Sequence, residues 1–140
     1  MYNISTGAIL QTQMRENKME REVNFGTKRF TRVVSNHEQG DGGAYHHYAV
    51  ESTQVPTAIY AQVDFQSGPV KEKGVNGCHQ EDLLIIVMDR LECFQKGAFR
   101  CKENAMVLTK IQEALQWLNA RTNKRQQQGI EGTSVNHEEE

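Results

Sequence analysis

The most regular pattern of apolar positions lies in the second half of the chain, between residues 78 and 128. From Lys102 to about Gln127, apolar residues recur every three or four positions, and the series continues to a threonine. The positions are Leu108, Ile111, Leu115, Leu118 and Thr122. Because residues three and four apart share one face of a helix, this spacing predicts an amphipathic helix.

A second apolar run comes before that helix. Residues 81–94 read EDLLIIVMDRLECF, which predicts a helix that is apolar on almost every side, so more than one neighbour must cover it. The short link 95–101 contains Gly97, a residue that can end a helix in a left-handed conformation. Since short links join antiparallel neighbours, we expect the two helices to form a hairpin.

Three strand-like runs precede the hairpin, at residues 29–34, 44–50 and 58–65. They are rich in β-branched and aromatic residues, and turn-forming residues separate them, which predicts an antiparallel meander. A sheet this small is only marginally stable alone, so we expect the hairpin to cover its apolar face. The predicted fold class is α+β, with a small N-terminal antiparallel β-sheet followed by a C-terminal two-helix antiparallel hairpin.

The chain length suits one globular domain, which we divide into four segments. Residues 1–27 are an N-terminal arm, either frayed or a short helix. Residues 28–77 hold the meander and a glycine-rich junction, residues 78–128 form the hairpin, and residues 129–140 are expected to be a disordered tail. The junction can simply connect sheet to hairpin, or its exposed amides can cradle an anion, although its glycine spacing is neither that of a Walker loop nor that of a dinucleotide-binding fingerprint.

Composition narrows the class of partner. The net charge of −2 and a pI of about 6.2 give no basic field that would attract nucleic acid. Three cysteines cannot all pair, so reduced thiols in a cytoplasm are expected. No apolar run approaches the ~20 residues of a membrane span, and no signal-peptide pattern follows Met1.

Residues able to carry chemistry are scattered. His46 and His47 are adjacent on an expected strand, so their side chains point to opposite faces and do not bind one metal ion together. Cys78 and His79 lack the second pair that a zinc site needs. No nucleophile or zinc-protease motif is present either. We therefore expect no catalytic residue, metal or cofactor, and a protein that binds rather than an enzyme.

Arg121 and Arg125 are four residues apart in the second helix, so they are expected to project from one face. Two guanidinium groups on a rigid face suit bidentate contacts with phosphate oxygens. The alternative is that both are simply solvated, because the dipole favours cations at the C-terminal end of any helix.

Phe94 and Asn104 flank the link between the helices. An aromatic ring there can stack on a base, and an amide can read the polar atoms of a base or ribose. The alternative is a core aromatic residue and an ordinary helix-terminal amide.

One small ligand cannot contact both ends of the second helix. Asn104 and Arg121 are 17 positions apart in sequence, or roughly 25 Å along a straight helix. If these residues bind one molecule, the pocket must be shared between two copies whose hairpins run antiparallel, and a two-fold dimer makes such pockets in pairs. The apolar first helix independently favours a partner surface.

Several multi-residue segments are similar to those of a known phage protein family. Between residues 44 and 133 the chain resembles the type 1 Thoeris anti-defence family of phages, sponges that sequester a bacterial immune signal. An anti-CBASS sponge shares the hairpin. The segments that carry the resemblance are residues 65–77, 81–84, 94–104, 114–122 and 129–133.

The resemblance implies a non-enzymatic protein of the host bacterial cytoplasm that binds cyclic ADP-ribose isomers at the hairpin dimer interface. It places the pocket aromatic residue of the family on Phe94, the pocket amide on Asn104 and two arginines on Arg121 and Arg125. It also implies that dimers can assemble into hexamers, with further pockets for cyclic di- and trinucleotides. Two alternatives remain: an oligomeric nucleic-acid-binding accessory protein that uses the two arginines, and a purely structural assembly module.

Overall fold

The computed structural model describes residues 21–26 and 30–136 of the 140 in the sequence. Contacts divide the chain into two compact units, residues 1–67 and 68–140. The division falls inside the segment 28–77, and the domain limits expected from the sequence stay predictions.

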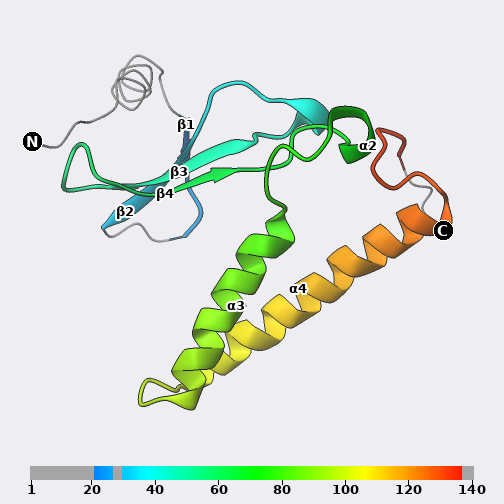
Figure 1. Ribbon diagram of the computed structural model, residues 1–140. Coiled ribbons are helices and arrows are strands. Elements are labelled where there is room, and N and C mark those ends of the chain that lie inside the picture. Colours follow the sequence, from blue (N-terminus) through cyan, green and yellow to red (C-terminus); the bar gives the residue numbers. More distant parts are fainter. Residues whose placement is uncertain (1–20, 27–29, 137–140) are drawn as a thin grey trace, which may run out of the picture. The chain divides into compact units, whose positions relative to one another are not determined.

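The first unit contains a four-stranded antiparallel sheet in the order β1-β2-β3-β4 (Figure 1). Its strands are β1 (Arg21–Val23), β2 (Thr31–Ser35), β3 (His47–Ser52) and β4 (Ile59–Asp64), with a short 3-10 turn, η1 (Asp41–Gly43), between β2 and β3. The predicted meander is confirmed, and the later three strands match the three apolar runs. The structure adds β1, which lies in the segment expected to be a frayed arm or a short helix. Residues 1–20 and 27 of that segment lie outside the described residues.

The centre of the sheet is held by cross-strand pairs on one face. Val34 and Ala49 are directly opposite each other on β2 and β3, and both are buried. Two residues along on the same face, the Arg32 guanidinium donates to the Glu51 carboxylate, with Nη2 and Oε2 3.0 Å apart. Opposed pairs of this kind fix the register, because a one-residue slip would move every side chain to the other face.

The second unit consists of α2 (Val70–Lys73), α3 (Gln80–Lys96) and α4 (Lys102–Gln127). Figure 1 shows α3 and α4 as an antiparallel hairpin joined at one end, as predicted. The two helices are closest near that end and diverge away from it. We call residues 95–101 the hairpin tip. The helix α2 was not expected, because it lies within the glycine-rich junction.

The ends of the long helices are defined by local hydrogen bonds. The His79 backbone N–H donates to the Asp82 carboxylate at the start of α3, at 2.9 Å. Gly97 follows α3 with φ −111° and ψ −162°. The predicted left-handed cap is therefore wrong: the Gly97 N–H bonds to the Phe94 carbonyl oxygen from an extended backbone.

One face of α4 forms a seam of buried or half-buried side chains. Its members are Asn104, Leu108, Ile111, Leu115, Leu118, Thr122 and Arg125. The predicted apolar stripe is thus confirmed, and it continues to a buried arginine. The apolar residues of α3 extend beyond its half-buried side, and Ile86 is 64 % exposed in the single chain.

Candidate functional site

Phe94 lies in the last turn of α3 and is half-buried. The Arg90 guanidinium lies over its ring, with the Arg90 Cζ atom 5.3 Å from the ring centroid. Phe99 meets the same ring edge-on, with the two ring centroids 6.5 Å apart. Phe99 itself is 78 % exposed. The last turns of α3 and the neighbouring tip therefore present aromatic surface and a cation together, a combination that favours stacking with a flat, electron-rich ligand.

Asn104 lies in the first turn of α4, at the start of the seam. Its backbone N–H donates to Cys101 Sγ at 3.4 Å, so the thiol caps the helix. This hydrogen bond satisfies one of the amides that a helix N-terminus leaves without an intrahelical partner. The cap fixes the backbone from which the Asn104 side chain extends.

The two sides of the tip are joined by the side chain of Gln95. Its Nε2 donates to the Cys101 carbonyl oxygen at 3.0 Å, and its Oε1 accepts from the Cys101 N–H at 2.9 Å. Through this pair, the residue after Phe94 is tied to the residue that caps Asn104. Sequence reasoning missed Gln95, because nothing in the helical spacing distinguishes it from a solvated glutamine.

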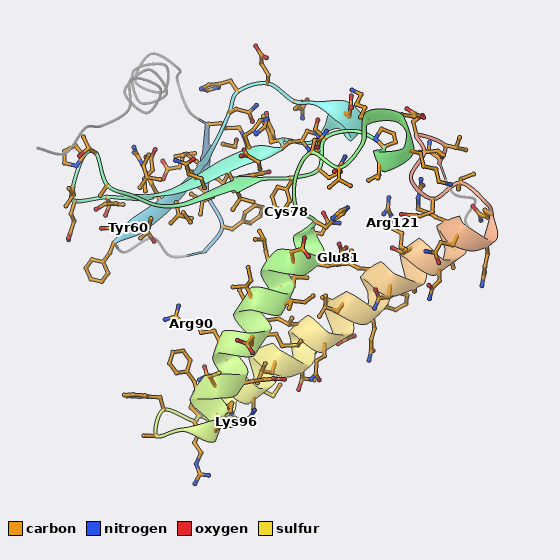
Figure 2. All side chains as sticks on the ribbon, viewed as in Figure 1. Tyr60, Cys78, Glu81, Arg90, Lys96 and Arg121 are labelled. Atoms are coloured by element: carbon orange, nitrogen blue, oxygen red, sulfur yellow. The ribbon has the colours of Figure 1, made fainter. Side chains whose placement is uncertain are left out.

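Arg121 is exposed and lies near the other end of α4. Figure 2 shows it far along the hairpin from the tip, where Lys96 is labelled. The helix is unbroken from Lys102 to Gln127, so Asn104 and Arg121 are roughly 25 Å apart along it. One chain therefore does not bring Arg121 together with Phe94 and Asn104.

Arg125 differs from Arg121 in its surroundings, although the two are one helical turn apart. Arg125 is 7 % exposed. Its Nε donates to Glu131 Oε2 at 3.0 Å. Its remaining hydrogen bonds go to the carbonyl oxygens of Val135 at 2.9 Å, Ile130 at 3.1 Å and Thr133 at 2.9 Å. The expectation that both arginines project together is therefore not met, since the Arg125 guanidinium points into its own chain.

These contacts also shape the C-terminal segment, which we define as residues 129–136. The Lys71 N–H donates to the Gly132 carbonyl oxygen at 3.0 Å, and Ser134 Oγ donates to Glu72 Oε1 at 3.3 Å. The segment therefore links the end of α4 to α2. The Arg125 guanidinium and α2 hold residues of this segment, which is part of the tail expected to be disordered from Gly129 onward. Residues 137–140 of that tail lie outside the described residues.

Other candidates from the sequence have ordinary partners. His47 Nδ1 lies 2.7 Å from Asp64 Oδ1, and His46 Nε2 lies 2.9 Å from the Asp41 carbonyl oxygen. Within residues 21–26 and 30–136, no three histidine, cysteine, aspartate or glutamate side chains gather as metal ligands would. None of the helices in that part of the chain is both long and apolar enough to cross a membrane.

A shallow hollow runs along α4. It is lined by Thr109, Gln112, Glu113, Gln116 and Trp117. None of the four predicted binding residues borders it, so it is not the site that the sequence predicts.

The hairpin is similar to known proteins. Residues 58–123 match the family described as "Acb2/Tad1, hairpin domain". A protein named "Thoeris anti-defense 1", from Bacillus phage SBSphiJ7, is 56 % identical over 73 residues, which are 52 % of this chain and 51 % of that relative. The match thus spans about half of the relative. The family match includes Phe94, Asn104 and Arg121 and ends before Arg125. Within residues 58–123, the chain is therefore similar to the Acb2/Tad1 hairpin domain.

Proposed function

We propose that this protein is a phage anti-defence sponge that binds cyclic ADP-ribose isomers in the host bacterial cytoplasm and holds them away from Thoeris effectors. The observation that carries the proposal is the 56 % identity with a phage protein named "Thoeris anti-defense 1". The name of that relative states an anti-defence role against Thoeris, and we add to it the binding of cyclic ADP-ribose isomers. No chemical step is needed, because a sponge acts by mass action alone.

The proposed pocket is shared between two copies of the chain. Ile85, Ile86 and Val87 of α3 are exposed in the single chain and supply apolar surface for a second hairpin. If the two hairpins pack antiparallel, the Arg121 end of one lies beside the tip of the other, and the 25 Å separation within each chain (about 17 helical rises) no longer matters.

Each residue then has a distinct contribution to binding. The Phe94 ring stacks on the adenine base, and the Asn104 amide exchanges hydrogen bonds with base or ribose. Arg121 donates to the diphosphate, for which a guanidinium fork is well shaped. A nanomolar dissociation constant corresponds to about −12 kcal/mol, and enclosure between two subunits supplies much of that by removing the ligand from water.

Arg125 is a predicted ligand contact, but in this proposal it has a structural role. Direct contact with a phosphate would first require the Arg125 guanidinium to leave Glu131 and three carbonyl oxygens. Hydrogen bonds to charged groups are each worth about 1.5–3 kcal/mol, so that release opposes binding. We assign the phosphate contact to Arg121, and to Arg125 the support of the end of α4. Hexamers and cyclic di- or trinucleotide pockets stay predictions of the resemblance.

The test is depletion and recovery. Purified protein is incubated with each cyclic ADP-ribose isomer, free nucleotide is measured after filtration, and the complex is then heated to release what was bound. Recovery of intact nucleotide supports the sponge, and recovery of a cleaved product would make the protein a hydrolase. Absence of depletion for every isomer contradicts the proposal.

The alternative of a nucleic-acid-binding accessory protein is weaker in the structure than in the sequence. It relied on two arginines on one face of α4, and Arg125 is buried, which leaves Arg121 as the exposed member of the pair. A salt-dependent gel shift with DNA would favour it, since phosphate contacts release counterions.

A further inference from the structure

The hairpin tip is closed by one side-chain amide. The Gln95 amide pairs with both the N–H and the carbonyl of Cys101, at 2.9 and 3.0 Å, much as one peptide group pairs with another across an antiparallel ladder. Gln95 is half-buried in the last turn of α3, while residues 96–101 of the tip are exposed. Two hydrogen bonds from a packed side chain therefore restrain an otherwise exposed connection.

The restraint is placed between two proposed ligand contacts. On one side, Gln95 directly follows Phe94 in the same helical turn. On the other side, Cys101 accepts the Asn104 N–H through its sulfur, at 3.4 Å. Neighbouring peptide bonds and three hydrogen bonds thus connect the Phe94 ring to the Asn104 backbone. Without Gln95, Cys101 keeps its hydrogen bond from the Ala105 N–H at 3.3 Å, but the cap on Asn104 loses both of its hydrogen bonds to α3.

We propose that Gln95 is a positioning residue for the nucleotide pocket, whose amide clamp on Cys101 holds Phe94 and Asn104 at a fixed spacing before the nucleotide arrives. The inference rests on the proposed function and adds to it. Binding is tighter when the contact groups are already in place, because less conformational entropy is lost on association. Gln95 itself need not touch the nucleotide.

Two substitutions separate the clamp from general stability. Gln95→Leu has a similar size and removes both hydrogen bonds. Gln95→Glu keeps the acceptor for the Cys101 N–H but loses the donor to the Cys101 carbonyl oxygen and sets a negative charge against it. Gln112→Glu, an exposed position on α4, is the matched control for the charge change.

We expect both Gln95 variants to bind a cyclic ADP-ribose isomer about ten-fold more weakly than wild type near neutral pH, the loss that one or two hydrogen bonds produce. The Gln95→Glu variant should regain affinity as the pH falls toward about 5. A protonated carboxyl again donates to the carbonyl oxygen, and that oxygen raises the pKa of the introduced group above its ordinary value of about 4.3. Wild type, Gln95→Leu and Gln112→Glu should show no such recovery. A purely structural role would not produce this pH profile.

Amide hydrogen exchange tests the clamp without any nucleotide. We expect faster exchange of the Cys101 and Asn104 N–H groups in Gln95→Leu, with the middle of α4 unchanged. Wild-type exchange at both amides would overturn the clamp. Faster exchange together with wild-type nucleotide affinity would overturn the positioning role. Failure of the wild type to bind any isomer would instead reject the proposed function, while the exchange result still decides the clamp.

Discussion

Arg121 and Arg125 are one helical turn apart, and they have different roles because one is exposed and the other is buried. Positions 104, 108, 111, 115, 118, 122 and 125 form the seam of α4, so Arg125 lies on it and Arg121 lies beside it. On the seam, a guanidinium is removed from water and must find partners, which Glu131 and three carbonyl oxygens provide. Beside the seam, Arg121 keeps its hydration and remains available.

This difference predicts that two alanine substitutions change stability by very different amounts. Arg125→Ala should lower the free energy of unfolding by about 3 kcal/mol, the lower end for a broken buried pair, because the Glu131 side chain is 38 % exposed. Arg121→Ala should change it by less than about 0.5 kcal/mol. Urea denaturation followed by circular dichroism measures both. Arg125→Lys is the matched control, since it keeps the charge but cannot make the same four hydrogen bonds. Equal stability of all three variants would contradict the buried role.

Arg121 should matter little for stability but strongly for nucleotide binding. Arg121→Ala is expected to weaken uptake of cyclic ADP-ribose isomers by roughly 10- to 100-fold, the effect of losing one or two charged hydrogen bonds. The oligomer should persist, because this side chain is exposed. Calorimetry and gel filtration test the two statements. Lys110→Ala, an exposed cation in the middle of α4, serves as the control and should bind as wild type does.

At the level of elements, the sequence predicted those helices and strands whose apolar residues recur at a regular spacing. The limits of α4 follow from its long stripe of apolar residues, and the strand pairing follows from three separated apolar runs. The sequence reading did not find β1, since Arg21–Val23 is too short to show alternation and owes its conformation to pairing with β2. It also could not find the partners of Arg125, because they are mostly backbone carbonyls of a segment with no periodicity. Sequence patterns indicate which side chains share a face of an element, but they do not indicate which backbone carbonyl oxygens accept hydrogen bonds.

Two glycines of the hairpin unit should respond to alanine in opposite directions. Gly97 has φ −111°, a value that alanine adopts readily, and an added Cβ would meet only ordinary contacts. Gly97→Ala should therefore raise the free energy of unfolding by about 0.4–1 kcal/mol through a less flexible unfolded chain. Gly132 has φ +77°, and its added Cβ would lie 3.0 Å from Lys71 Cγ. Gly132→Ala should lower it by about 1–2 kcal/mol.

Chemical denaturation of the two variants checks this contrast. Gly129→Ala is the control for backbone strain alone, because Gly129 has φ +71° with nothing within 4 Å of its added Cβ. It should lose less stability than Gly132→Ala. A destabilised Gly97→Ala variant would indicate that the backbone there is left-handed after all.

At the scale of the whole molecule, the hairpin carries more apolar surface than one chain covers. Among the described residues of this unit, Ile111 is the buried apolar side chain, while Ile86, Val107 and Trp117 are all exposed. Exposed apolar surface of this extent on paired helices is typical of an interface. The shared pocket forms only when this surface packs against a second copy. A substitution that prevents dimer formation should therefore also abolish nucleotide binding.

Ile86→Glu tests this coupling, because Ile86 is 64 % exposed in the single chain and a charge there costs little unless a second copy covers it. We expect a folded monomer by circular dichroism and analytical ultracentrifugation, and loss of nucleotide uptake although Phe94, Asn104 and Arg121 are all intact. Phe25→Glu is the matched control, since Phe25 is 92 % exposed in the sheet unit and its substitution should leave assembly and uptake unchanged. An Ile86→Glu monomer that still takes up nucleotide would show that one chain suffices. A wild-type monomer at working concentrations would remove the shared pocket, because α4 keeps Asn104 and Arg121 at opposite ends of one rigid helix.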